Sequence, residues 1–553
     1  MFVRIKTTPN SPRKSVQIVT SVRKGTRVIQ KIVRHVGVAH DDMELKQLKS
    51  LAEAIRIKLE AGDQQLIFSP EQVAEETLRA KERASTELEL DYKVNLKNLR
   101  EEQRVISGIH DVYGTLFDEL GYQSILKGKR NKVSREIFKQ IVLARIANPV
   151  SKKASVDMLA ANFGISLNLD HVYQMMDKLD DEAIDNLNKL SYLNTKKLFS
   201  EKIDLVFFDC TTLYFESFEE DELRRNGYSK DLKFNQPQVV MSLMVTKEGL
   251  PIGYEIFEGS TYEGHTLIPQ IKEFKKKYQI DKVVFVADAG MMNTANLEAL
   301  DSENLEYIVG CRLKSLPQSL QDKVTDPKSY STITDNLKIG TFEHNSRKIV
   351  VSYSETRARK DSYDREKCIE RLKKKLEKHK NPKAYLSNFG NKKYLEVSKD
   401  IKITLNAEKI ASDAKWDGLH GVITNAQDLP SQEILAQYNN LWQVEAAFRI
   451  TKHDLKVRPI YHWSPRRVIA HLAISFTAFS LVKYLEYRVK LQYIKLSPEK
   501  IKQILLSVQT SILFDSTKKI RYGLPSATSK GALKIYNIFD LSRSLTPFII
   551  KIM

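Results

Sequence analysis

The stretches LVFFD at residues 205–209 and VVFVAD at residues 283–288 decide the fold of this chain. Each is a run of large apolar residues that ends in an acid. A run of four or five such residues predicts a buried strand. The acid that follows, Asp209 in the first stretch and Asp288 in the second, is then held rigidly at the edge of a sheet.

The segments around these two stretches predict a mixed α/β sheet. We expect strands at residues 205–209, 239–245, 252–257, 283–288 and 307–310, with helices at about 266–278 and 294–301. Three consecutive strands followed by alternating helices and strands indicate one mixed sheet. This order matches an RNase H-like core, except that one helix of such a core has not yet occurred by residue 310.

The missing helix is expected from Ser431 onward, with Ser431 as its N-cap. Tyr438, Glu445 and Lys452 follow at steps of seven residues, and a helix has about 3.6 residues per turn, so the three side chains share one face. A carboxylate can bind metal, an ammonium can contact phosphate, and a phenol can hydrogen-bond or stack. Alone, Glu445 is explained better by an ordinary surface charge pair. Together with Asp209 and Asp288 it completes three carboxylates, which can hold two divalent cations.

The order of patterns along the chain predicts six segments. They are a basic β-rich module at 1–40, a helical DNA-binding region at 41–200, the first part of the core at 201–314, a β-rich insertion at 315–429, the final core helices at 430–490, and a basic helical region at 491–553. The helical region holds a weak helix-turn-helix pattern at 156–165. The insertion includes one exposed basic helix at 365–380.

The charge of the chain is its most unusual bulk property. It has 88 Lys and Arg against 69 Asp and Glu over 553 residues, a net charge of +19. Such an excess suits a polyanion partner, although a basic surface without a dedicated partner explains it as well. The three cysteines show no paired spacing, which indicates a reducing compartment. The longest apolar stretch, around 471–482, is interrupted by Ser and Thr and predicts a buried helix rather than a membrane span.

The residues and spacings described above resemble those of a known protein family. With Tyr438, Glu445 and Lys452 in place, the chain resembles bacterial insertion-sequence transposases of the DDE class. The similar branch carries a Y-x2-R-x3-E-x6-K helix and has a β-strand insertion before that helix. Further similar segments are GYSKD (227–231), GLPIG (249–253), WDG (416–418) and RPIYH (458–462). One position departs, because Leu441 stands where the branch has Arg. Arg449, one helical turn beyond Glu445, is a candidate for the role of that Arg.

The resemblance implies an enzyme that binds the terminal inverted repeats of its own mobile element in double-stranded DNA. It implies that Asp209, Asp288 and Glu445 are catalytic and hold two Mg²⁺ (or Mn²⁺) ions, and that Tyr438 and Lys452 contact DNA. Hydrolysis then frees the element ends, and strand transfer joins them to target DNA. Pairing of two ends implies a homodimer or a larger synaptic complex, in the cytoplasm at the nucleoid and without a membrane.

Three other functions remain open from the residues alone. An RNase H-like nuclease or resolvase cuts DNA without joining it, and a catalytically silent protein only binds DNA. A metal-dependent phosphatase acting on small molecules fits the basic charge least well.

Overall fold

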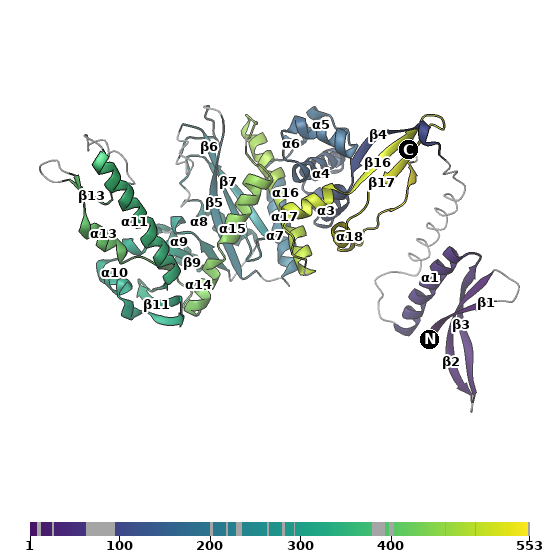
Figure 1. The fold of residues 1–553 in the computed structure, drawn as a ribbon, viewed down its shortest axis with the longest axis horizontal. Helices are drawn as coiled ribbons and strands as arrows, with labels where there is room; N and C mark the ends of the chain where they lie inside the picture. Colours follow the sequence, from purple (N-terminus) through teal and green to yellow (C-terminus); the bar gives the residue numbers. More distant parts are fainter. Residues whose placement is uncertain are drawn as a thin grey trace. The chain divides into compact units, whose positions relative to one another are not determined.

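The computed structural model describes two units of this chain (Figure 1). The described residues are 1–7, 13–24, 27–61, 94–199, 203–216, 219–227, 235–262, 265–278, 283–291, 293–378, 393–397, 403–458, 460–492 and 494–550. The units are Met1–Asn98 and Leu99–Met553. Residues 228–231 of the GYSKD segment, Pro459 of RPIYH, and the last two residues of the expected helix at 365–380 lie outside the described residues.

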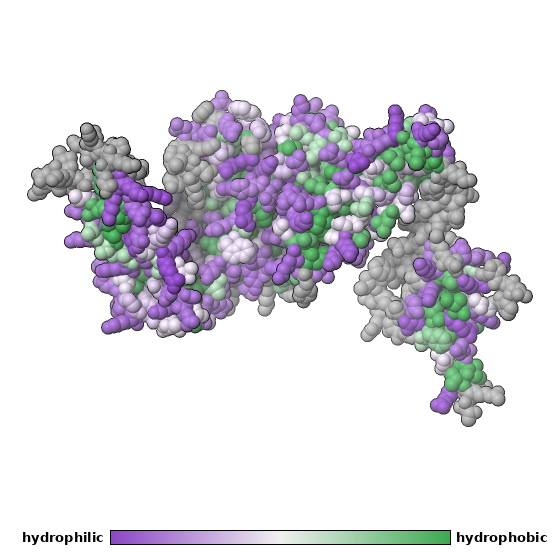
Figure 2. Space-filling model, viewed as in Figure 1, coloured by the Kyte–Doolittle hydropathy of each residue, from purple (hydrophilic) through white to green (hydrophobic). Residues whose placement is uncertain are grey.

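The N-terminal unit is a three-stranded antiparallel sheet covered by one helix. Its elements are β1 (Phe2–Thr7), β2 (Lys14–Lys24), β3 (Arg27–Ala39) and α1 (Asp42–Ala61). The β-rich module is present as expected, but α1, expected to begin the helical region, packs on this sheet around Ala52. Hydrophobic residues also reach the surface along β2 and β3 (Figure 2), among them Val28, Ile29 and Ile32.

The larger unit is built on a nine-stranded mixed sheet with the order β10-β11-β12-β15-β9-β8-β5-β6-β7. The strands of its central block are β5 (Leu205–Tyr214), β6 (Gln238–Val245), β7 (Pro251–Glu258), β8 (Val284–Ala287) and β9 (Glu306–Cys311). Strand β8 runs parallel to both β5 and β9, whereas β6 is antiparallel to β5 and β7. Three antiparallel strands followed by two parallel ones make an RNase H-like core, as the sequence predicted.

Helices cover both faces of this sheet. One face carries α8 (Leu267–Tyr278), α9 (Thr294–Ser302) and α10 (Gln318–Thr325). The other carries α14 (Ser431–Asn439), α15 (Trp442–Arg449) and α16 (Pro465–Leu491). Phe208 and Ala287 lie in the first of these cores, and Phe207 and Val286 in the second. Because strand residues alternate between faces, Asp209 is directed toward the face of α14 and α15.

The expected insertion does not form a separate sheet, because most of its strands extend the core sheet. These are β10 (Ser331–Thr334), β11 (Leu337–His344), β12 (Arg347–Ser354) and β15 (Leu419–Thr424), and β15 pairs with β9. Pairing covers the edge of β9, which would otherwise expose its backbone groups. The other elements are α11 (Glu355–Lys378), β13 (Leu395–Val397), β14 (Ile403–Leu405) and α13 (Ala407–Ala414). The basic helix α11 begins ten residues earlier than expected.

The region expected to be helical contains a strand, so the prediction is wrong at β4 (Leu99–Ile106). Its helices are α3 (Gly108–Glu119), α4 (Lys132–Ala147), α5 (Lys152–Phe163), α6 (Leu169–Met176) and α7 (Asp181–Leu198). Helices α5 and α6 are joined by a short turn that begins at Gly164, which has φ of +69°. Gly164 and Ile165 of the expected helix-turn-helix do lie in this turn, but residues 156–163 form one helix, and the second helix, α6, begins only after residue 165.

The C-terminal region is also not wholly helical as expected. It contains α17 (Pro498–Leu506), β16 (Gln509–Asp515), β17 (Ile520–Pro525), α18 (Lys530–Asn537) and β18 (Phe548–Ile550). Its three strands and β4 form an antiparallel sheet in the order β18-β17-β16-β4. The short 3₁₀ segments of the chain are η1 (Leu96–Asn98), η2 (Tyr122–Ser124), η3 (Lys129–Asn131), η5 (Ala289–Met291), η6 (Leu313–Ser315) and η7 (Pro327–Ser329).

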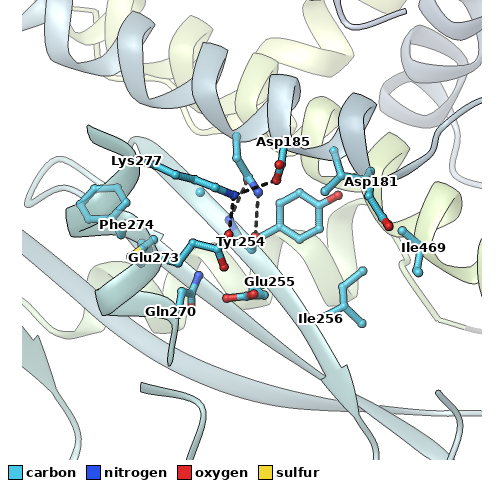
Figure 3. A pocket seen from close by; sticks show the side chains of 14 residues that line it. Asp181, Asp185, Tyr254, Glu255, Ile256, Gln270, Glu273, Phe274, Lys277 and Ile469 are labelled. Carbon is cyan, nitrogen blue, oxygen red and sulfur yellow. Dashed lines mark hydrogen bonds and ion pairs between the residues drawn. The ribbon is translucent and has the colours of Figure 1, made fainter. Parts of the chain in front are cut away.

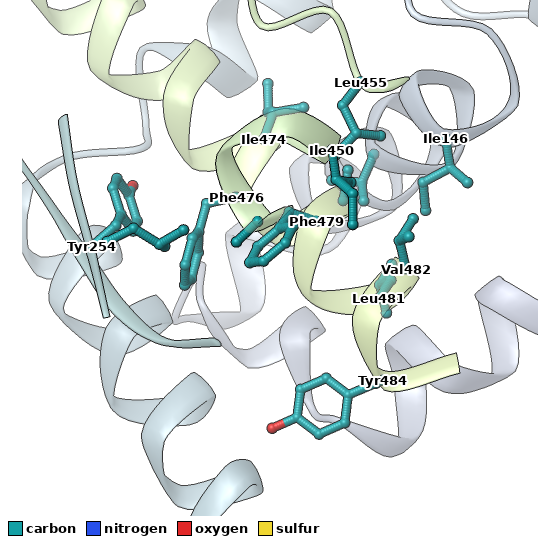
Figure 4. Packing of buried hydrophobic residues seen from close by; sticks show 14 of the residues in the cluster. Ile146, Tyr254, Ile450, Leu455, Ile474, Phe476, Phe479, Leu481, Val482 and Tyr484 are labelled. Atoms are coloured by element: carbon teal, nitrogen blue, oxygen red, sulfur yellow. The ribbon is translucent and has the colours of Figure 1, made fainter. Parts of the chain in front are cut away.

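Helix α16 lies inside the main hydrophobic core (Figure 4). The ring of Phe476 lies 4.4 Å from that of Tyr254 on β7. The apolar stretch around 471–482 is part of a helix of 27 residues. Length and composition alone would suit a span, but 94% of its apolar window is buried inside the protein, as expected for a core helix.

We expect Phe476→Ala to lower the free energy of unfolding by about 3–5 kcal/mol, because it leaves a cavity where a fully buried ring now packs. The matched control is Leu491→Ala at the end of the same helix, where the side chain is 56% exposed. That change should shift stability by no more than about 0.5 kcal/mol. Denaturant titration compares the two, and equal losses would contradict the assignment of this core.

Candidate active site

The two strand acids lie on neighbouring parallel strands. Phe208 of β5 pairs with Ala287 of β8, and the next residue on each chain is Asp209 and Asp288. Parallel strands lie about 4.8 Å apart, so the register brings the two acids side by side where β8 ends. Each carboxylate accepts a hydrogen bond from the following backbone N–H, Cys210 to Asp209 at 2.8 Å and Ala289 to Asp288 at 2.7 Å.

Tyr438 links the strand acids to the helices. It lies near the end of α14, which packs on β8 and β9, and its side chain is buried. Its hydroxyl donates a hydrogen bond to Asp288. Burial, and then the negative charges of Asp288 and Glu445, raise the pKa of Tyr438, so the phenol stays neutral and keeps its proton to donate.

Gly310 of β9 makes room for this phenol. A Cβ atom on Gly310 would lie 2.5 Å from the Tyr438 hydroxyl oxygen and 2.8 Å from the Ala289 nitrogen. Both distances are shorter than real Cβ contacts, so only glycine allows Tyr438 to reach Asp288 in this way. No pattern in the sequence indicates this role beyond the glycine itself.

The sequence predicted that Glu445 and Lys452 continue the helix of Tyr438. In the structure they lie instead in two further segments. Helix α14 ends at Asn439, Glu445 is on α15, and Lys452 is on the π-helical segment η9 (Ile450–Asp454). The bond from Leu441 N–H to the Tyr438 carbonyl is a tight i to i+3 contact that ends the first helix. The single stripe expected from steps of seven is therefore wrong. Tyr438 is buried, Glu445 exposed and Lys452 half-buried.

The start of α14 also differs from the prediction. Pro430 occupies the N-cap position, and no side chain caps this end. The Ser431 hydroxyl, expected to be the cap, instead hydrogen-bonds the hydroxyl of Thr341 on β11 at 2.9 Å. This contact ties α14 to the strands of the insertion.

The remaining predicted residues also have defined places. Leu441 is 7% exposed and belongs to the main core, so an Arg at this position would have to bury its charge. Arg449 is exposed in the last turn of α15. Cys210 is buried in the core on the opposite face of the sheet, and its Sγ lies 2.9 Å from Oγ1 of Thr266. Within the described residues, no three His, Cys, Asp or Glu side chains stand close enough together to hold a metal ion.

A family model described as the transposase DDE domain matches residues 200–481. This chain belongs to the DDE transposase family. The matched residues run from before β5 into α16 and include Asp209, Asp288 and Glu445.

Solved structures similar to this DDE family member include a piggyBac transposase synaptic complex with hairpin DNA, at 10% identity and a TM-score of 0.37 over 72% of this chain and 76% of that one. A Mos1 transposase paired-end complex with left transposon end is similar at 15% identity and a TM-score of 0.14, over 52% of this chain and 77% of that one. No curated protein sequence matches the chain.

Two residues near the acids of this DDE domain, His420 and Arg357, were not predicted from the sequence. The ring of His420 on β15 lies 5.3 Å from that of Tyr438. Burial lowers the pKa of His420, and the positive charge of Arg357 in the first turn of α11 lowers it further. Gly418, with φ of +79°, donates its N–H to Asp361 of α11 at 3.0 Å and so ties that helix to β15. The WDG segment was the one sequence signal near these residues.

A second acid-rich cavity of the DDE domain lies by β7, away from the predicted acids (Figure 3). Lys277 of α8 forms ion pairs with Asp185 at 2.8 Å and with Glu273 at 2.6 Å. Burial, and then the charge of Glu273, raise the pKa of Glu255 to about 7. The cavity therefore holds a carboxyl group that is easily protonated.

We expect Gly310→Ala to destabilise the protein by about 1–3 kcal/mol, because the new methyl group overlaps the Tyr438 hydroxyl. Gly253→Ala on β7 is the matched control, since its nearest non-hydrogen atom would be 3.4 Å away. Adding Tyr438→Phe to Gly310→Ala should recover part of the loss, because it removes the overlapped oxygen. Thermal unfolding of wild type, the three single variants Gly310→Ala, Gly253→Ala and Tyr438→Phe, and the double variant measures this, and purely additive losses would contradict the contact.

We expect Glu255→Gln to change how stability depends on pH. The folded pKa of Glu255, about 7, lies above its ordinary value of 4.5, so the folded state binds more protons between these values and stability falls as pH rises through them. Glu255→Gln should make that fall less steep, whereas Glu258→Gln, exposed at the end of the same strand, should not. An unchanged slope in denaturant titrations at several pH values would argue against a buried Glu255.

Proposed function

We propose that this protein is a DDE transposase that binds the terminal inverted repeats of an insertion sequence, cuts DNA there and joins the freed ends to target DNA. The observation that carries the proposal is the parallel register of β5 and β8, which sets Asp209 beside Asp288 on the face of Tyr438 and Glu445. Membership of the DDE transposase family supports it. Bacterial insertion sequences are the proposed source of the DNA ends.

The donor chemistry of the three acids fits a divalent cation. Carboxylate oxygens are the ligands that Mg²⁺ and Mn²⁺ prefer, and in this proposal Asp209, Asp288 and Glu445 hold two such ions. When bound, these ions activate the attacking oxygen and stabilise the leaving one. Since Asp288 and Glu445 are exposed, their side chains are free of packing that would hinder a move toward Asp209.

The residues around the acids orient them and the DNA. The neutral phenol of Tyr438 holds the Asp288 carboxylate through its hydrogen bond and adds no charge of its own. The ammonium of Lys452 and the exposed guanidinium of Arg449 supply positive charge for the phosphates beside the cut. No covalent enzyme intermediate is needed for an in-line attack on phosphate.

The proposed partner is double-stranded DNA, both as element ends and as target. The net charge of +19 supports it, because phosphate contacts supply affinity that does not depend on sequence. Bringing two element ends together requires a homodimer or a larger synaptic complex. Because the proposed DNA substrate is chromosomal, the proposed location of the protein is the cytoplasm, at the nucleoid.

We expect Asp209→Asn, Asp288→Asn and Glu445→Gln each to reduce cleavage of an element end to below about one hundredth of the wild-type rate. Each change removes a carboxylate ligand with little change in shape, so binding of the end should stay within a few-fold of wild type. Cleavage of a labelled duplex with Mg²⁺ and a gel-shift assay measure the two properties.

The matched control is Glu255→Gln, an acid of the other cavity, which should cut at the wild-type rate. Normal cleavage by Asp288→Asn would remove the assignment of the site. Supplying precut ends with target DNA tests joining: a protein that cuts but never joins would be a nuclease or resolvase, and one that only binds would be catalytically silent.

A further inference from the structure

A further cavity, of about 620 Å³, lies between the helical region and the loop that follows η9. It is lined by residues at the end of α4 and the start of α5, by Lys456, Arg458, Tyr461 and His462 of the loop, and by His471 of α16. The proposed chemistry of the acids makes no use of it, and it explains the RPIYH segment that sequence analysis singled out. The residues that line it include cations, histidines and tyrosines but no acid among the described residues.

Two buried cations stand at the wall of this cavity. Arg145 is 5% exposed and donates to the backbone carbonyls of Leu455 at 2.8 Å and Lys456 at 3.1 Å. Lys152 is 4% exposed, and its Nζ lies 3.2 Å from Nδ1 of His471. These contacts use neutral acceptors, so they satisfy hydrogen bonds without balancing either charge.

The histidines of the cavity cannot balance these charges. Nε2 of His471 lies 3.1 Å from the Val457 carbonyl, so Nε2 carries the proton and Nδ1 accepts from Lys152. Burial, and then the charge of Lys152, lower the pKa of His471 well below its ordinary value. Burial and the same lysine lower the pKa of His462 to about 4. Both rings are therefore neutral. Burial, and then the charge of Arg145, also lower the pKa of Lys152 well below its ordinary value, so its charged form is disfavoured until an anion binds beside it.

Burying a cation without a counter-charge is costly, and an anion from outside would reduce that cost. Helix α5 adds to the attraction, because it begins at Lys152 and the N–H groups of its first turn have no partner within the helix. Lys456 and Arg458 add further positive charge at the loop. The cavity is thus built for a compact anion with several acceptor oxygens, as phosphate has.

The surroundings favour phosphate that belongs to a nucleic acid. Tyr461 at the cavity and the adjacent Trp463 are 66% and 64% exposed, and exposed aromatic rings next to cations suit stacking of bases. Arg458 stacks over Tyr214, the last residue of β5, at 4.3 Å. Asp209 lies five residues earlier on this strand, roughly 16 Å away at about 3.3 Å per residue. A DNA strand covers that distance in a few nucleotides.

We propose that this cavity binds a backbone phosphate of DNA, with Lys152 and Arg145 as its buried cations. The inference rests on the proposed function, because it takes the DNA in that cavity to be the DNA held at Asp209. It adds a contact from the helical region, which precedes the core strands and Glu445 in the chain.

The first experiment uses inorganic phosphate and the full-length protein. The melting temperature of wild type should rise with phosphate, relative to chloride at equal ionic strength and pH, as expected for a ligand of the folded state. Lys152→Met should melt no lower than wild type in chloride and should gain less than about half of the phosphate-dependent rise. Lys139→Met, on α4 but paired with Asp118 at 2.6 Å, is the matched control and should keep the full rise.

The second experiment measures DNA binding against salt concentration. Lys152→Met should make the slope of log K against log[salt] less steep by about 0.9, the value for one duplex phosphate contact. Should Lys152→Met fail to fold, the exposed Lys456→Met provides the same comparisons. Loss of the phosphate response with an unchanged salt slope would mean that the cavity takes a free phosphate, and overturns the DNA assignment. A wild type that does not respond to phosphate overturns the site altogether.

These readouts do not depend on cleavage. Asp209→Asn should keep both the phosphate response and the salt slope. A protein that keeps both but never cuts DNA would disprove the proposed function while leaving the phosphate cavity in place.

Discussion

The parallel pairing of β5 with β8 is the constraint on which the candidate site depends. Both strands are buried on two faces, and the pair Phe208–Ala287 sets their register. A slip of one residue would turn every side chain of β8 to the opposite face and direct Asp288 away from α14. Large apolar residues in both cores resist such a slip, so the hydrophobic core determines where the carboxylates stand. The chemistry of the site is in this sense a consequence of packing.

The register of β5 and β8 brings carboxylates close together, and Tyr438 lies beside them as a neutral hydrogen-bond donor. Two carboxylates close to a third repel one another, and a cation between them is the usual remedy. In the protein alone, a neutral phenol near Asp288 and Glu445 donates to the first. Gly310 allows the approach because it has no Cβ. The absence of one methyl group on β9 therefore lets a helix residue reach a strand acid.

The sequence predicted the parts of this arrangement that depend on local pattern. Apolar runs gave the central strands, and the acids at their ends followed from position. Contacts between distant segments could not be read in this way: β4 pairs with β16 some 400 residues later, and β15 joins the insertion to β9. The end of α14 at Asn439 was also missed, because no Gly or Pro marks it. His420 and Arg357 reach the acids only through that long-range pairing.

One continuous segment connects the acids to the buried cations. From Ser431 to His462 the chain carries Tyr438, Glu445 and Lys452, and then the loop that closes the cavity of Lys152. A single straight helix would keep residues seven apart on one face. The break after Asn439 changes that phase between the buried Tyr438 and the exposed Glu445, and the π-helical η9 changes it again at the half-buried Lys452. A π segment adds a residue to a helical turn, and such segments persist where the altered direction is useful. Here the altered direction lets one segment contribute to two sites of opposite charge, acids for metal and cations for phosphate.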